Sequence, residues 1–138
     1  MSQASQRILA LDIGTVRTGI AIADTATKIA IPYRAISSQD VDLQQHIKQI
    51  IQDESINGIV VGLPRNQSGE TTKQTDFVNK IANDLRTLGV AIFFQDESLT
   101  SVIAEDRLQA RGGKYTRADI DIEAATIILQ DFLESNRL

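Results

Sequence analysis

The stretch that decides the fold is ILALDIGTVRTGIAIAD, residues 8–24. Its first part, Ile8 to Ile13, is apolar except for Asp12, which predicts a buried strand that carries one carboxylate. Gly14-Thr15 indicates a tight turn, and the apolar residues from Thr18 to Ala23 predict the returning strand of a hairpin. Burying an unpaired charge is costly. Asp12 therefore needs a cation or hydrogen bonds near the open end of this hairpin.

Composition narrows the class of protein. A chain of 138 residues with 42% hydrophobic content fits one domain, residues 1–138, with a conventional core. Its apolar runs are too short for a membrane span, and residues 1–6 lack the basic and apolar parts of a signal peptide. We therefore expect a cytoplasmic protein with no membrane partner. The net charge of −4 argues against a protein that coats nucleic acid through bulk electrostatics.

Hydrophobic periodicity predicts alternating strands and helices. Pro32 marks the third strand as an edge strand, because proline cannot donate a hydrogen bond to a neighbouring strand. The order of elements predicts an α/β fold in which helices flank a five-stranded mixed sheet. The predicted strands cover residues 8–13, 18–23, 29–36, 59–64 and 90–95, and the predicted helices cover 39–54, 71–88, 100–110 and 119–135.

Three acidic residues stand at the ends of predicted elements: Asp12 ends the first strand, Glu97 follows the fifth, and Asp121 opens the last helix. If the first and fifth strands are parallel, their carboxyl ends share the edge where α/β folds bind ligands. Converging carboxylates repel one another unless cations neutralise them, so the set predicts a metal site. Taken singly, Glu97 also fits a solvated residue and Asp121 a helix cap, and Asp119 is the main alternative to Asp121.

The chain has no cysteine, so a metal ion would be held by oxygen ligands or by His46. Carboxylates favour hard cations, and we therefore expect Mg²⁺ or Mn²⁺.

Two segments supply candidate contacts to phosphate. In the loop 65–70, Arg65 or Asn66 fits either a phosphate contact or a turn that uses Asn and Gly for conformational reasons. The segment 107–117 holds basic residues, two glycines and no acidic residue. It is either a substrate contact or a solvated connection whose replacement would hardly affect folding. The candidates for substrate binding are Arg17, Arg65, Asn66, Arg111, Lys114 and Arg117.

The hairpin is similar to the first hairpin of two groups of phosphoryl-transfer proteins, the ribonuclease H-like nucleases and the actin and sugar-kinase ATPases. An ATPase of this type closes two such domains around its nucleotide. The chain lacks the length for a second lobe and contains no second glycine-rich phosphate loop. The nuclease interpretation is therefore favoured.

Four blocks together resemble the YqgF/RuvX family over nearly the whole chain. They are LDIGT (11–15) with Arg17 and Gly19, VVGLP (60–64) with Asn66 and Gly69, DESLTS (96–101) with Ala104 and Glu105, and DIEAA (121–125) with ILQ (128–130). The resemblance implies a ribonuclease H-like fold, dependence on Mg²⁺ or Mn²⁺, and a hydrolase of phosphodiester bonds that matures precursor 16S rRNA. It also implies that the acidic site consists of Asp12, Glu97 and Asp121.

Two positions depart from the family pattern. Ser98 stands where the family more often has arginine, and Arg65 stands where an apolar residue is commoner. Three functions remain open: a nuclease for precursor rRNA, a Holliday junction resolvase for branched DNA, and a non-catalytic nucleic-acid-binding or ribosome-assembly factor. Ribosomal particles are expected partners of the first and third, and the sequence is compatible with a monomer or a homodimer.

Overall fold

The computed structural model describes residues 5–39, 42–64, 73–97 and 100–135. Within these residues the strands form one five-stranded sheet in the order β3-β2-β1-β4-β5. The β1-β2 and β2-β3 pairs are antiparallel, whereas β1, β4 and β5 run parallel to one another. This confirms the predicted mixed sheet. The elements are β1 (Arg7–Ile13), β2 (Arg17–Asp24), β3 (Ile31–Ser37), α1 (Leu43–Asp53), β4 (Gly58–Pro64), α2 (Lys73–Leu85), the 3-10 helix η1 (Arg86–Leu88), β5 (Ala91–Glu97), α3 (Thr100–Arg111) and α4 (Arg117–Glu134).

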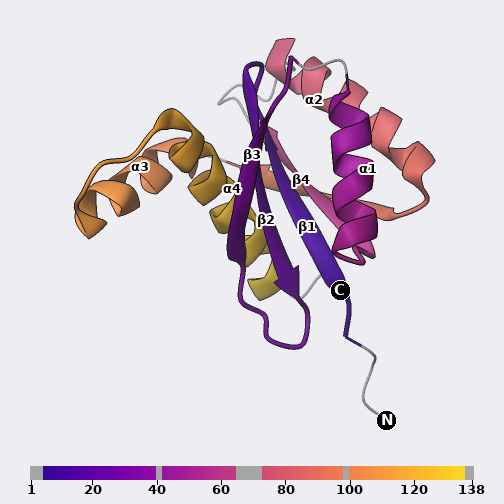
Figure 1. Cartoon of the computed structure of the whole chain (residues 1–138), viewed down its shortest axis with the longest axis horizontal. Helices are drawn as coiled ribbons and strands as arrows, with labels where there is room; N and C mark the ends of the chain where they lie inside the picture. The colour runs from indigo at the N-terminus through magenta and orange to yellow at the C-terminus, as the bar shows by residue number, and fades with distance from the viewer. Residues whose placement is uncertain (1–4, 40–41, 65–72, 98–99, 136–138) are drawn as a thin grey trace.

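Helices cover both faces of the sheet. Figure 1 shows α1 and α2 on one face and α4 on the other, with α3 set to one side next to α4. The strand β3 lies at the edge of the sheet, as Pro32 predicts, and the β2-β3 register shifts between Ile20 and Ala21 beside that proline. The described residues contain no helix that is both long and apolar enough to cross a membrane.

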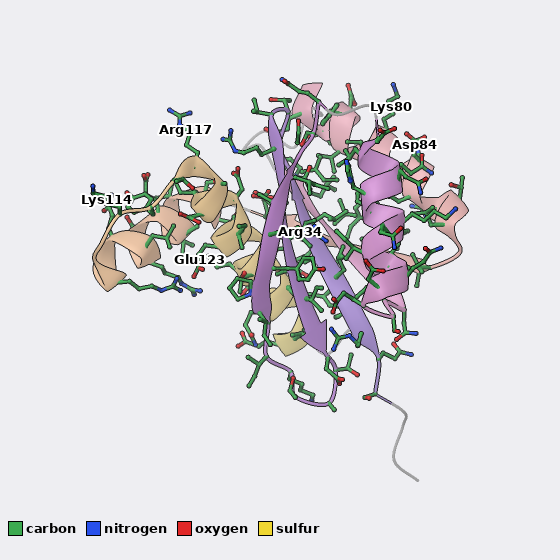
Figure 2. All side chains as sticks on the ribbon, viewed as in Figure 1. Arg34, Lys80, Asp84, Lys114, Arg117 and Glu123 are labelled. Carbon is green, nitrogen blue, oxygen red and sulfur yellow. The ribbon has the colours of Figure 1, made fainter. Side chains whose placement is uncertain are left out.

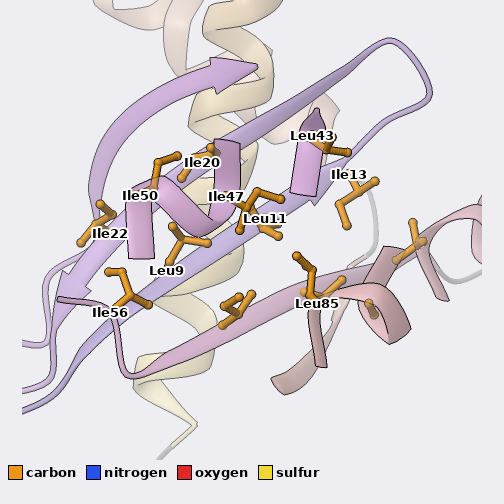
Figure 3. Close-up of a cluster of buried hydrophobic side chains, with 14 residues drawn as sticks. Leu9, Leu11, Ile13, Ile20, Ile22, Leu43, Ile47, Ile50, Ile56 and Leu85 are labelled. Carbon is orange, nitrogen blue, oxygen red and sulfur yellow. The ribbon is translucent and has the colours of Figure 1, made fainter. Parts of the chain in front are cut away.

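The alternation of side chains along β1 divides the core into two layers. Leu9, Leu11 and Ile13 pack under α1 and α2, in the cluster drawn in Figure 3. Ile8 and Ala10 pack on the opposite face against α4. Because side chains alternate along a strand, Asp12 belongs to the α4 face. The sequence thus directs one carboxylate toward the helix that carries Asp121.

Some boundaries differ from the predicted ones. The helix α4 begins at Arg117 instead of 119, because Thr116 and Asp119 form a capping box. The Thr116 hydroxyl accepts from the Asp119 backbone N–H at 3.2 Å, and the Asp119 carboxylate accepts from the Thr116 N–H at 2.8 Å. Asp121 consequently lies past the first turn and does not open the helix as predicted. Likewise β5 continues through Glu97, so this residue ends the strand instead of following it.

The two helices on the other face are shorter than predicted. The helix α1 begins at Leu43, and α2 gives way after Leu85 to the 3-10 turn η1. Gly89 follows as the C-terminal cap of η1, with a left-handed φ of 79°.

Candidate functional site

Asp12 is the centre of the candidate site. It lies one residue before the end of β1, is only 9% exposed, and pairs across the sheet with Gly19 of β2. Burial raises the pKa of Asp12 well above its ordinary value, and the charge of Glu97 and a hydrogen bond with its side chain raise it further. The charge of Asp121 acts in the same direction. The fold therefore brings the three predicted carboxylates into one electrostatic neighbourhood.

Glu97 reaches this neighbourhood from the last position of β5. The hydroxyl of Thr100, the first residue of α3, donates to Glu97 Oε1 at 2.8 Å. A Cβ placed on Gly62 of β4 would lie 2.7 Å from Glu97 Oε2. Gly62 thus leaves the space that the Glu97 carboxylate occupies between β5 and β1. Neither Thr100 nor Gly62 is marked by its residue type in the sequence.

Asp121 is brought to the sheet by a backbone contact. A Cβ placed on Gly19 would overlap the backbone carbonyl oxygen of Asp121, so α4 packs directly on β2 opposite Asp12. Ala124 and Ala125, small residues one turn further along α4, are fully buried. At Asp121 itself, however, the glycine on the sheet permits the contact. The side chain of Asp121 accepts a hydrogen bond from Arg17 Nε at 2.8 Å.

The neighbouring acids of α4 serve other contacts. The Asp119 carboxylate caps the helix through the Thr116 N–H. Glu123 is 4% exposed and forms an ion pair with Arg111 at 2.7 Å and with Arg107 at 3.9 Å, both on α3. Neither Asp119 nor Glu123 is among the groups whose charge acts on Asp12. These contacts favour Asp121 over Asp119 as the third member of the site.

The predicted substrate contacts fall in different surroundings. Lys114 and Arg117 are exposed, and Figure 2 shows them pointing outward near the connection between α3 and α4. Gly112 and Gly113 in that connection have φ of 79° and 81°. Arg111 ends α3 and is held by Glu123, and Arg17 is held by Asp121. Arg65 and Asn66 lie outside the described residues. All six assignments stay predictions.

A pocket of about 380 Å³ adjoins Asp121, a feature that the sequence did not reveal. Arg17 and Asp121 form one part of its wall, and Tyr115 and Arg117 form another. The Tyr115 hydroxyl donates to Glu105 at 3.0 Å, which fixes the ring against α3. The pocket thus places two arginines and one carboxylate of the candidate site around a common opening.

The residues fit a hard divalent cation. All three carboxylates offer oxygen ligands, the kind that Mg²⁺ and Mn²⁺ prefer. The side-chain oxygen of Gln95, two residues before Glu97 on β5, is buried without a hydrogen-bond partner in the described part of the chain. As the side chains stand, no three acidic or histidine side chains of the described residues form a group ready to hold a metal ion. Asp121 Oδ2 contacts Arg17, so the carboxylate that would complete the set already has a cationic partner.

The sheet order and the helices on both faces give the chain a ribonuclease H-like fold. The chain belongs to the RuvX family, whose model, described as Holliday junction resolvase, matches residues 6–135.

Similar proteins cover nearly the whole chain. A protein of Chloroflexus aurantiacus is 39% identical over 96% of this chain and 89% of its own length. A protein of Synechocystis sp. is 40% identical over 94% of this chain and 88% of its own length. Both carry the name "Putative pre-16S rRNA nuclease". T. thermophilus RuvC in complex with a Holliday junction substrate shares the fold, with a TM-score of 0.61 at 10% identity over 94% of each chain.

Proposed function

We propose that this protein is a metal-dependent nuclease, a hydrolase of phosphodiester bonds that acts on structured nucleic acid. Its proposed substrate is precursor 16S rRNA in ribosome biogenesis, with ribosomal particles as partners and the cytoplasm as its location. The observation that carries the proposal is the buried Asp12, on which the charges of Glu97 and Asp121 both act. The names of the relatives support the choice of substrate.

In this proposal Asp12, Glu97 and Asp121 hold Mg²⁺ or Mn²⁺. Such an ion, when bound, activates a water molecule and stabilises the leaving oxygen of the phosphodiester. Asp12 is fixed by the sheet, and Thr100 orients one oxygen of Glu97 through its hydroxyl. The closed packing of α4 on Gly19 keeps bulk water from one side of Asp12. Because water is the nucleophile in this reaction, no histidine or cysteine nucleophile is required.

Basic residues around the site are the proposed contacts to the nucleic-acid backbone. Lys114 and Arg117 are exposed next to the pocket that adjoins Asp121, which suits them to hold phosphates beside the carboxylates. Arg17 lines the same pocket. We also assign Arg65, Asn66 and Arg111 to this set. Arg111 also forms the ion pair with Glu123.

A cleavage assay with the purified protein tests the proposal. Precursor 16S rRNA, a four-way DNA junction and single-stranded controls are each incubated with Mg²⁺, Mn²⁺ or EDTA. We expect cation-dependent cleavage of the precursor, loss of cleavage in Asp12→Asn and Glu97→Gln, and unchanged cleavage in Asp84→Asn. Asp84 is a matched acidic control because it is exposed on α2, across the sheet (Figure 2). Cleavage that persists in EDTA would contradict the proposal.

Branched DNA is the second candidate substrate, favoured by the description of the family model. In the same assay, cleavage of the four-way junction without cleavage of the precursor would assign the resolvase activity. Binding of either substrate without cleavage under any cation would assign the non-catalytic role.

A further inference from the structure

Arg17 forms a specific contact inside the candidate site. Its Nε donates to Asp121 Oδ2 at 2.8 Å, and the two side chains are only 33% and 23% exposed. Arg17 is the first residue of β2, and its carbonyl accepts from the Gly14 N–H at 3.0 Å, which fixes the backbone at the hairpin turn. The guanidinium is therefore presented to Asp121 by the same hairpin that carries Asp12.

This contact offsets the repulsion among the three carboxylates in the metal-free protein. Burial and the charge of Glu97 raise the pKa of Asp12, and Asp121 adds a further negative charge. Arg17 supplies a positive charge to the third carboxylate. The contact also turns an oxygen of Asp121 toward Arg17 at a site where the described acidic side chains do not yet form a group able to hold a metal ion.

We propose that Arg17 is a positioning residue, an internal counterion that holds Asp121 in the metal-free protein and releases it when the carboxylates take up a divalent cation. This inference rests on the metal-dependent function proposed above. The guanidinium already contacts Oδ2 of the carboxylate that the cation would use, so binding of one should weaken binding of the other. Removal of Arg17 should then have two opposite effects. The metal-free fold should lose stability, and the affinity for the cation should rise.

Mn²⁺ titrations followed by thermal unfolding of the full chain test the proposal. For Arg17→Gln we expect a lower Tm than wild type in EDTA, together with a Mn²⁺ midpoint at least about threefold lower, since a partly buried ion pair must no longer be broken. Arg17→Lys keeps the positive charge and should bind Mn²⁺ within about twofold of wild type. Arg117→Gln removes an exposed cation of the same pocket and should leave the midpoint nearly unchanged.

The Asp121→Asn background distinguishes two effects of Arg17, its competition with Mn²⁺ for the Asp121 carboxylate and its direct repulsion of the cation. If Arg17 acts through Asp121, adding Arg17→Gln to Asp121→Asn should produce a much smaller gain in Mn²⁺ affinity than it does in wild type. An equal gain in both backgrounds would overturn the proposal, because it would mean that Arg17 merely repels the cation.

The remaining outcomes distinguish this inference from the proposed function. A wild-type protein that binds Mn²⁺ and cleaves nucleic acid, with unchanged or weaker binding in Arg17→Gln, overturns the role of Arg17 alone. Absence of any Mn²⁺ response in wild type and in every Arg17 variant overturns both the metal site and this inference. A response that emerges only in Arg17→Gln supports the counterion role, whatever the nuclease assay shows.

Discussion

At the scale of single residues, the burial of Asp12 has a measurable consequence for stability. A carboxyl group whose pKa is raised on folding keeps its proton in the folded protein above its ordinary pKa of 3.8. Its contribution to the free energy of unfolding is therefore most favourable below the ordinary pKa. This contribution is lost as the pH rises through the raised pKa of the folded protein. At neutral pH and without metal, Asp12 thus reduces the free energy of unfolding.

We accordingly predict that Asp12→Asn is more stable than wild type in EDTA at pH 7 to 8, because the amide carries no charge to bury. The difference in Tm should shrink as the pH falls toward the ordinary pKa of aspartate. Cleavage should fall by roughly a thousandfold or more, since loss of a metal ligand removes several kcal/mol of transition-state stabilisation. Thermal unfolding over a pH series measures the first effect. A Tm below that of wild type throughout the series would contradict it.

Gly19 is the residue whose size matters most to the site. In Gly19→Ala the new methyl group meets the backbone oxygen of Asp121, and a backbone atom cannot move aside as a flexible side chain does. We expect a loss of about 1–3 kcal/mol in the free energy of unfolding, the usual cost of overpacking, and a strong loss of cleavage because α4 shifts.

Gly58→Ala is the matched control for this substitution, since it also changes a buried strand glycine. Its new Cβ would lie 3.3 Å from a ring atom of Phe93, a side chain that can adjust. Denaturant unfolding of both variants gives the comparison, and a Gly19→Ala protein as stable as Gly58→Ala would refute the packing argument.

Sequence reasoning at this scale proposes the three carboxylates, but it does not predict the contacts that place their side chains. Asp12 is conspicuous because a charge interrupts an apolar strand. The pair Arg17–Asp121 joins residues that are 104 positions apart, and the roles of Gly19 and Thr100 depend on contacts that exist only after folding. Residue type and spacing alone carry no signal for such contacts.

At the scale of elements, α3 and α4 are joined by a buried charge. Arg111 is 59% exposed in its side chain, yet its guanidinium pairs with a Glu123 carboxylate that is almost fully buried. Its removal therefore leaves a buried acid with only the longer contact to Arg107 at 3.9 Å. The expectation that replacing the basic segment would hardly affect folding does not extend to Arg111.

We predict that Arg111→Ala lowers the free energy of unfolding by about 1–2 kcal/mol, less than for a fully buried pair because Arg111 is exposed to solvent. Lys114→Ala, an exposed neighbour, should stay within about 0.5 kcal/mol of wild type. Adding Glu123→Gln to Arg111→Ala should restore part of the loss, because the buried charge is removed. Urea unfolding of wild type, the two single variants and the double variant gives the comparison, and equal losses in Arg111→Ala and Lys114→Ala would argue against the ion pair.

The ends of the strands and helices depend on local sequence signals such as proline and helix-capping residues. The mixed sheet and the edge position of β3 agree with expectation, because short apolar runs indicate buried strands and Pro32 cannot donate to a neighbouring strand. The predicted start of α4 is two residues too late, because Thr116, three residues before Asp119, is the capping residue. A Thr-x-x-Asp spacing was available in the sequence as the signal.

At the scale of the whole molecule, an acidic protein must hold a polyanion through a local surface. The net charge is −4, whereas Lys114 and Arg117 project together from the lobe formed by α3 and α4 (Figure 2). Phosphate contacts release counterions, so their number sets the salt dependence of binding and contributes little to sequence preference. The affinity for a bound strand would then depend on these two cations and on Arg17.

The double variant Lys114→Ala/Arg117→Ala should bind precursor rRNA more weakly than wild type, with the slope of log K against log salt reduced by up to about one unit for each lost contact. Cleavage positions should not change, because neither residue belongs to the carboxylate site, and folding should hardly change, because both side chains are exposed. Arg34→Ala is the matched control, since Arg34 is exposed on β3, away from this lobe (Figure 2). The test measures the affinity for precursor rRNA over a series of salt concentrations. If the double variant and Arg34→Ala both give the slope of wild type, the connection between α3 and α4 is only a solvated link. The substrate would then be held elsewhere.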